Sequence, residues 1–486
     1  MAEMSLKKAA LINAASKYIN IFLGVFFSAI LARILTPNDY GIVAIVTVFT
    51  SFFLVLSNIG FGIAVIQNKD FTRHDVDSLF TITIYVGVVL GGLFALLGAP
   101  IDAFFHESVY KGICVLLSFS VFFNTVNAVP EAMLRRNKQF LLIGIRLVVV
   151  SSLTYGLTIL LALRGAKYYA LVFQSIISSV LIFVWNMHSA HIRCVRDVNW
   201  KLLSKIRSYS GFQFLFNVSN YFSRNLDKLL IGKVIGNEGL AQYNKAYHFM
   251  LYPVQNLTNI ITPVLHPIFS DYQNRRDILY EKYLKIVRVL SLTGVLVQTV
   301  CFFCAREIIL ILYGGQWLQA VVCFRYLSMA IWLQMIGGTC GSMFAALSDT
   351  KRQFIANCFC IALLIAGLFV SVQSKDVAKI ALSVAGILNL HFLINYLFLV
   401  KGSMKIPFLI FLGELLPGFA LLAMMIPVGI LLNHIIHSEV LLVSFLVKGM
   451  ILSGTYFLLL VMTNQYKHLL PILPARLRRR LDHGHI

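Results

Sequence analysis

The sequence is short of charged residues. Only 13% of its 486 residues are Asp, Glu, Lys or Arg, whereas 59% are hydrophobic and the mean hydropathy is +0.81. A soluble chain of this length cannot bury that much apolar surface in a core of its own. The shortage of charge therefore excludes a soluble globular protein and indicates an integral membrane protein.

Other sequence patterns are also missing, and their absence excludes further classes of protein. No run of short segments alternates strictly between apolar and polar residues, which excludes an outer-membrane barrel. A GxxxxGK[ST] motif is missing, which argues against nucleotide-driven transport by this chain. The cysteines include one CxxC pair, Cys301 and Cys304, without a second pair or a nearby histidine, so we expect no metal site.

Long apolar stretches recur along the whole chain. Each has about 20 residues, enough to cross roughly 30 Å of hydrocarbon as a helix. They predict an all-α integral membrane fold with about 14 transmembrane helices. The predicted spans cover residues 9–35, 41–66, 79–99, 112–130, 140–163, 168–188, 208–235, 239–266, 287–305, 318–345, 354–372, 377–399, 407–432 and 439–461.

The formal net charge of +21 comes from alternate loops. Arg and Lys are more frequent on one side of the predicted membrane by roughly four to one, which by the positive-inside rule places both termini in the cytoplasm. The RLRRR sequence at 476–480 is expected to contact anionic lipid headgroups. Membrane topology thus explains the basic balance, and we expect no nucleic-acid partner.

The two halves of the chain show a weak internal repeat. Both contain a short Asn/Asp/Glu/Gly turn, beginning at Leu35 and at Ile235. Adding 200 to the residue number also aligns Asn13 with Gln213, Lys17 with Asn217 and Asn20 with Asn220. An even number of spans in each half predicts two six-helix lobes related by a parallel pseudo-repeat around a central cavity. Coincidence between two helices with scattered polar residues is the alternative.

These features predict four regions. An N-terminal six-helix lobe covers 1–200 and a C-terminal six-helix lobe covers 201–400. Two additional transmembrane helices occupy 401–463, and a basic cytoplasmic tail covers 464–486.

The seventh span carries a polar face. Spacings of three and four residues place one set of side chains on one side of the helix. This set comprises Gln213, Asn217, Asn220, Arg224 and Asp227, with Tyr221 and Lys228 beside it. A charge at mid-bilayer costs a few kcal/mol on insertion scales, so the face is expected to line a hydrophilic cleft. In the alternative, Arg224, Asp227 and Lys228 neutralise one another and serve only folding.

Further charges lie within or at the ends of spans. They are Arg146, Lys245, Arg325, Glu131 and Glu414. Basic residues outnumber acidic ones, which favours an anionic substrate. Arg146 and Lys245 lie close to span ends, where a long basic side chain can instead reach the membrane interface.

Three segments resemble a known family. They are ARILTPNDYGIVA at 32–44, VPEAMLRRNKQF at 129–140 and SRNLDKLLIGKVIGNEGLAQYNKAY at 223–247. They resemble the polysaccharide transporter (Wzx-type oligosaccharide-lipid flippase) family of the multidrug/oligosaccharidyl-lipid/polysaccharide exporter superfamily. The resemblance implies two six-helix lobes around a central cavity, often with two added helices.

The resemblance also implies a function. Members of this family move undecaprenyl-diphosphate-linked oligosaccharides from the cytoplasmic to the outer leaflet of the bacterial cytoplasmic (inner) membrane. They serve capsule, O-antigen (lipopolysaccharide) or exopolysaccharide synthesis. Related lipid II flippases use basic cavity residues and a proton or sodium gradient. The implied partners are the lipid-linked oligosaccharide, membrane lipids, and a polysaccharide polymerase and glycosyltransferases.

The residues above can be assigned roles on that basis. A diphosphate is a compact anion that needs cationic side chains in a water-accessible cleft. The candidates for binding it are Arg224, Lys17, Lys228 and Arg325. The candidates for binding sugar hydroxyls are Asn13, Asn20, Gln213, Asn217, Asn220 and Tyr221. Asp227 is the candidate for carrying a coupling H⁺ or Na⁺, and no other cofactor is expected.

Three other functions remain open. A small-molecule or multidrug exporter of the same fold, coupled to H⁺ or Na⁺, usually needs cavity carboxylates. A membrane glycosyltransferase or polymerase needs outer-loop carboxylates and a sizeable periplasmic domain, whereas acids such as Glu307 are scattered over short loops. A non-transporting assembly scaffold would not need a polar stripe at mid-membrane. We therefore expect a transporter and not an enzyme.

Overall fold

The structure is a computed structural model. It describes residues 6–57, 60–68, 70–200, 202, 218, 221–222, 224–270, 272, 275–436 and 438–468 of the chain. Every regular element within these ranges is a helix. The all-α class expected from the sequence is confirmed.

The described helices are long enough to span a membrane repeatedly. Eleven are long and apolar enough to cross, and a twelfth span is added if the bent pair Gly315–Ser328 and Ile331–Ala346 counts as one. The protein is therefore a multi-pass membrane protein. Residues 208–217, 219, 220 and 223 of the seventh predicted span, 208–235, lie outside the described residues, and the helix over the eighth, Asn237–Ser270, is not among the eleven. The number 14 stays a prediction.

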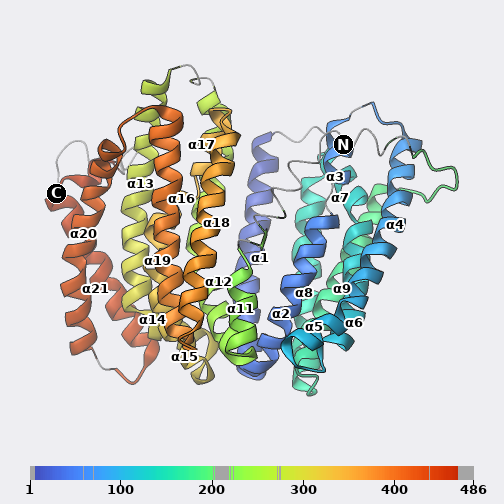
Figure 1. The fold of residues 1–486 in the computed structure, drawn as a ribbon, viewed down its shortest axis with the longest axis horizontal. Helices are drawn as coiled ribbons and strands as arrows, with labels where there is room; N and C mark the ends of the chain where they lie inside the picture. The colour runs from blue at the N-terminus through green and yellow to red at the C-terminus, as the bar shows by residue number, and fades with distance from the viewer. Residues whose placement is uncertain are drawn as a thin grey trace. The chain divides into compact units, whose positions relative to one another are not determined.

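The chain forms two compact units, Met1–Ala241 and Gln242–Ile486. The predicted lobe boundaries at 200 and 400 stay predictions. Figure 1 traces the helices of the first unit, which are α1 (Leu6–Ile34), α2 (Pro37–Ser57), α3 (Phe61–Gln67), α4 (Arg73–Leu96), α5 (Gly98–Phe105), α6 (Tyr110–Val126), α7 (Ala128–Arg136), α8 (Phe140–Leu163), α9 (Tyr168–Ala190), α11 (Leu226–Val234) and the start of α12 (Asn237–Ser270).

Capping residues set where helices of the first unit begin. At the start of α4, the Thr72 side chain accepts from the Asp75 amide, while Asp75 accepts from the Thr72 amide at 3.0 Å. This reciprocal arrangement satisfies two amide donors that a helix otherwise leaves unpaired. Within the unit α4 packs on α6, and α9 packs on α6 and α8.

The start of α12 packs on the first turns of α2. A Cβ added to Gly41 would overlap the backbone of Asn237, so only glycine permits this approach. Asn237 is fixed in turn by the Tyr110 hydroxyl, which donates to its side-chain oxygen at 2.8 Å. The helix boundaries here repeat at the offset of 200, because α1 ends at Ile34 and α11 at Val234, and α2 begins at Pro37 and α12 at Asn237.

The second unit contains the remaining helices. They are α13 (Arg276–Phe303), α14 (Ala305–Tyr313), η1 (Gly315–Trp317), α15 (Leu318–Ser328), α16 (Ile331–Gly337), α17 (Cys340–Ala346), α18 (Thr350–Val372), α19 (Val377–Tyr396), the π-helical η2 (Leu397–Met404), α20 (Phe408–Ile435), α21 (Leu441–Met462) and η3 (Gln465–His468). Figure 1 shows α20 and α21 in red, and both pack against α13.

The core of the second unit is aromatic and internally hydrogen-bonded. The buried Tyr283 and Tyr396 hydroxyls lie 2.6 Å apart, and Tyr283 also bonds to Thr339 at 2.8 Å. Because lipid offers no hydrogen bonds, buried hydroxyls must find partners inside the bundle. The outer faces are apolar instead: Leu409 is 80% exposed and Val370 is 71% exposed. These side chains face lipid in a multi-pass protein.

Candidate functional site

The first unit contains a cavity of ≈ 220 Å³ between α2, α6 and α9. It lies near the middle of the three helices, and its polar lining consists of hydroxyl and amide side chains without a charge. The polar lining residues are Thr47, Thr50, Ser51, Ser120, Asn124, Ser175, Ser178 and Ser179.

Several of these groups are anchored to backbone carbonyls. The Thr47 hydroxyl donates to the Val43 carbonyl at 2.7 Å, and the Asn124 amide donates to the Ser120 carbonyl at 2.8 Å. A hydroxyl that donates in this way keeps lone pairs for a further donor. The cavity therefore presents acceptors of the kind that bind the hydroxyl groups of a sugar.

Sequence reasoning missed this cavity. Its signal is the spacing of three and four residues that repeats among Thr47, Thr50 and Ser51 on α2 and among Ser175, Ser178 and Ser179 on α9. Such spacing places hydroxyls on one helix face. In an apolar span these residues also pass as small packing residues, which is why the pattern is easily overlooked.

Three predicted site residues, Asn13, Lys17 and Asn20, lie on α1. Lys17 is exposed, and Asn20 is half-buried. The side-chain oxygen of Asn20 is buried and accepts no hydrogen bond among the described residues. The side chain of Asn13 lies outside the described part of the structure, as do Gln213, Asn217 and Asn220.

The charged part of the seventh predicted span does not form one continuous helix. Arg224 and Asn225 form a turn before α11, and Arg224 is exposed there. Asp227 is buried in the first turn of α11. The Lys228 ammonium donates to the Asn225 side chain at 3.0 Å. Arg224 and Asp227 therefore do not extend one helical stripe as the spacing predicted.

Tyr221 and Arg325 have separate surroundings. The Tyr221 hydroxyl donates to the carbonyl of Val48 on α2. Arg325 is half-buried on α15, and its Nε is buried without a partner among the described residues. Lys17, Arg224 and Lys228 belong to the first unit and Arg325 to the second, so their joint action on a diphosphate stays a prediction.

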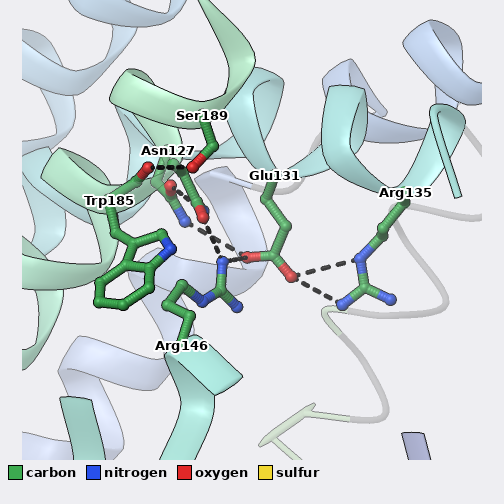
Figure 2. A network of polar contacts seen from close by, with 7 residues as sticks. Asn127, Glu131, Arg135, Arg146, Trp185 and Ser189 are labelled. Atoms are coloured by element: carbon green, nitrogen blue, oxygen red, sulfur yellow. Dashed lines mark hydrogen bonds and ion pairs between the residues drawn. The ribbon is translucent and has the colours of Figure 1, made fainter. Parts of the chain in front are cut away.

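Arg146 is held in a buried polar network of α7, α8 and α9. It is 5% exposed, and its Nη1 donates to Asn186 at 2.5 Å. Asn186 donates to Asn127 at 2.8 Å, and Glu131 lies 3.9 Å from the Arg146 guanidinium. Figure 2 shows Glu131 between Arg146 and Arg135. Arg146 is therefore buried in the first unit and held by polar partners.

The second unit contains a buried ion pair that the sequence did not reveal. Lys448 on α21 donates to Glu307 on α14 at 2.6 Å, and both side chains are less than 10% exposed. Ser444 donates to the same Glu307 oxygen at 2.8 Å, and Lys448 also donates to Asn433 at 2.7 Å. The pair joins α20 and α21 to α14.

Lys245 is enclosed by aromatic rings. Its ammonium lies 4.8 Å from the Tyr313 ring centre and 5.5 Å from that of Trp317. Cation–π attraction of this kind stabilises a desolvated ammonium. The Lys245 ammonium is therefore stabilised by aromatic side chains of its own unit.

Comparison of the sequence with known proteins identifies the family of the chain. The family described as "Polysaccharide biosynthesis protein" matches residues 30–322, which is more than half of the 486-residue chain. The chain belongs to this family. The family predicted from the sequence motifs is thereby confirmed.

Relatives of this polysaccharide biosynthesis protein are distant but cover most of its length. It is 24% identical over 369 residues to the teichuronic acid biosynthesis protein TuaB of Bacillus subtilis (strain 168), covering 76% of each chain. It is 21% identical over 426 residues to the lipopolysaccharide biosynthesis protein WzxC of Escherichia coli (strain K12), covering 84% of this chain and 86% of that protein.

The fold of this polysaccharide biosynthesis protein matches a solved transporter. The lipid II flippase MurJ in an inward closed conformation superimposes with a TM-score of 0.72 at 15% identity, covering 94% of this chain and 99% of that chain. At this identity the likeness shows the fold alone. The protein therefore has a MurJ-like all-helical membrane fold.

Proposed function

We propose that this protein is a flippase for lipid-linked oligosaccharides. It moves undecaprenyl-diphosphate-linked repeat units across the bacterial cytoplasmic membrane by alternating access, with both termini in the cytoplasm. The single observation that carries the proposal is the family match over residues 30–322. The MurJ-like fold and the polysaccharide pathways named for the relatives support it.

The proposed substrate has three parts with different chemistry. Cationic Arg224, Lys17, Lys228 and Arg325 bind the diphosphate. The hydroxyl-lined cavity of the first unit, together with the predicted polar residues of the first and seventh spans, binds the sugars. The polyprenyl tail stays in lipid, because transferring it into a polar cleft would expose its apolar surface to water.

We further propose that an ion gradient drives the cycle. Asp227 is buried at the start of α11 and carries the coupling H⁺ or Na⁺. Substrate supply and product removal require partner enzymes, a glycosyltransferase that assembles the repeat unit and a polymerase that consumes it. The protein itself performs transport and makes or breaks no covalent bond.

Three glutamates within the helices argue against a multidrug exporter. Glu131, Glu307 and Glu414 each form an ion pair with a basic residue. A carboxylate that is already paired offers little attraction to a cationic drug. Among the predicted site residues whose side chains the structure describes, the two exposed ones, Lys17 and Arg224, are both basic, which fits an anionic substrate.

The test is export of the surface polysaccharide in cells that depend on this protein. Arg224→Ala should abolish export and leave lipid-linked repeat units on the inner leaflet, with the protein level unchanged. Arg275→Ala removes another exposed arginine, just before α13, and should leave export intact. Wild-type export by the Arg224 variant would refute its diphosphate role, and no export defect in cells lacking the protein would refute the flippase.

A further inference from the structure

The second unit contains a second polar cavity, of ≈ 190 Å³, between α13, α20 and η3. This volume is far above the roughly 15 Å³ that one water molecule needs. Among its lining residues are Arg288 and Ser291 of α13, Glu414 of α20, and Gln465 and His468 of η3. None of these residues belongs to the proposed oligosaccharide site.

The cavity is built around an ion pair with unused hydrogen-bonding capacity. Arg288 donates a hydrogen bond through Nε to Oε2 of Glu414 at 2.8 Å, and its Nη2 forms an ion pair with the same oxygen at 2.6 Å. Within the described residues, Nη1 of Arg288 and Oε1 of Glu414 make no hydrogen bond. The side chains are 32% and 24% exposed, respectively, so a ligand can reach both. The pair therefore presents a donor and an acceptor beside each other.

The charges in the cavity sum to zero at neutral pH. Arg288 and Glu414 cancel, and His468 is mostly uncharged because burial, followed by the field of Arg288, lowers its pKa below the usual value. A simple anion would gain from Arg288 but meet repulsion from Glu414. A ligand with both a negative and a positive group complements both residues.

The wall of the cavity is closely packed. A Cβ on Gly418 would lie 2.6 Å from the Ser291 hydroxyl and 2.7 Å from the Trp332 ring, so α20 approaches α13 closely there. The Trp332 indole donates to Ser291 at 2.9 Å. A closely packed wall preserves the positions of the two charges.

The cavity lies where the charged part of α13 meets its uncharged part. Arg288 is the last charged residue of α13, and its remaining residues to Phe303 are uncharged. Arg and Lys concentrate at this boundary between headgroups and hydrocarbon. On α20, the lining residues Pro417 and Gly418 are flanked by Leu416, 64% exposed, and Phe419, 48% exposed. Lipid can therefore reach the cavity from the side.

We propose that this cavity binds the headgroup of a zwitterionic phospholipid that carries a primary amine. The phosphate accepts from Nη1 of Arg288, and the ammonium donates to Oε1 of Glu414. A primary ammonium can donate hydrogen bonds, whereas a quaternary ammonium cannot. The site therefore selects phosphatidylethanolamine over phosphatidylcholine, and over the anionic phosphatidylglycerol. The proposal does not rest on the proposed transport.

The test is native mass spectrometry of the full-length protein, purified from membranes and exposed to equal amounts of the three lipids. Phosphatidylethanolamine should be retained over the other two by about tenfold. The variants Arg288→Gln and Glu414→Gln should lose this preference. A double variant, Glu281→Gln with Lys285→Gln, removes an exposed pair on the same helix and should keep it.

A charge-swapped double variant separates lipid binding from folding. Arg288→Glu with Glu414→Arg restores the ion pair and should keep the wild-type unfolding temperature, but it reverses the order of the charges and should not recover the lipid preference. Equal retention of the three lipids, a preference for phosphatidylglycerol, or full lipid preference in the swapped variant would each overturn the proposal.

Discussion

Individual charged residues in this protein are stabilised by dedicated partners. Arg146 is surrounded by Asn186 and Glu131, and Glu131 also pairs with the exposed Arg135. Removing a buried partner leaves the remaining polar groups unpaired, whereas removing an exposed partner exposes them to water. The two arginines therefore contribute to stability very differently, although they share one carboxylate.

Arg146→Ala should lower the free energy of unfolding by about 3 kcal/mol or more, the usual cost of breaking a buried pair. Arg135→Ala should change it by less than about 1 kcal/mol, because its side chain is 52% exposed. The measurement is unfolding of both variants in the same detergent. Equal losses in both variants would contradict the network in Figure 2.

Asp349 provides a pH-dependent contact outside the membrane spans. Partial burial raises its pKa, but hydrogen bonds from Ser403 and Arg352 outweigh this and hold the pKa below the ordinary value of 3.8. The native state therefore binds the proton less readily than the unfolded chain. By linkage, the stabilisation is complete above the ordinary pKa and is lost as pH falls toward the native pKa.

Asp349→Asn should remove that part of the pH dependence. The stability difference between the wild type and the variant should be constant at pH 5 to 7 and should shrink as the pH falls below about 4. Thermal unfolding in a series of buffers measures it. A difference that stays constant down to pH 3 would show that Asp349 is not held ionised by these contacts.

The ion pair of Glu307 and Lys448 connects two helices, α14 and α21. It is buried and fixes α21 to α14, while Asn433 of α20 shares the Lys448 ammonium. Burying two charges costs desolvation energy that the pair only partly recovers. Such a pair adds little net stability, and its main effect is to favour one arrangement of the helices over others.

A double-mutant cycle tests this role. Glu307→Gln or Lys448→Met alone should destabilise the protein by about 3–5 kcal/mol, because the partner charge stays buried. The double variant should recover most of that loss. If the single effects simply add, the two residues are not coupled, and the contact between α14 and α21 does not depend on them.

Helices were predictable from the sequence because an apolar run of about 20 residues has one stable structure in lipid. Their interruptions were less predictable. The bend of 55° between Gly315–Ser328 and Ile331–Ala346 and the turn at Arg224 depend on tertiary packing, which apolar runs do not encode. Hydropathy reports burial in lipid and not the course of the backbone.

The functional groups were only partly predictable. Glu307 and Lys448 are 141 positions apart, so no local spacing connects them. The hydroxyl-lined cavity uses Ser and Thr, which also occur as ordinary packing residues in membrane helices. The family was predictable because its motifs are local, near residues 32–44 and 223–247.

At the scale of the whole molecule, translocation of a lipid-linked diphosphate requires a basic route across the membrane. The family and the fold support transport of a lipid-linked saccharide. We propose that the exposed Lys17 and Arg224 supply the positive charge that a diphosphate needs. In cells, polysaccharide export also depends on several other proteins, so an export assay does not isolate the translocation step. Purified protein in liposomes isolates the translocation step.

The most direct measurement is the transbilayer movement of a fluorescent polyprenyl-diphosphate-linked saccharide in proteoliposomes. With an ion gradient applied, a membrane-impermeant quencher added outside should extinguish nearly all fluorescence with the wild type and with Arg275→Ala. With Arg224→Ala, as in empty liposomes, only the outer leaflet, about half of the signal, should be quenched within the same time. Wild-type protein that leaves the inner-leaflet signal intact, or an Arg224 variant that matches the wild type, would contradict the account.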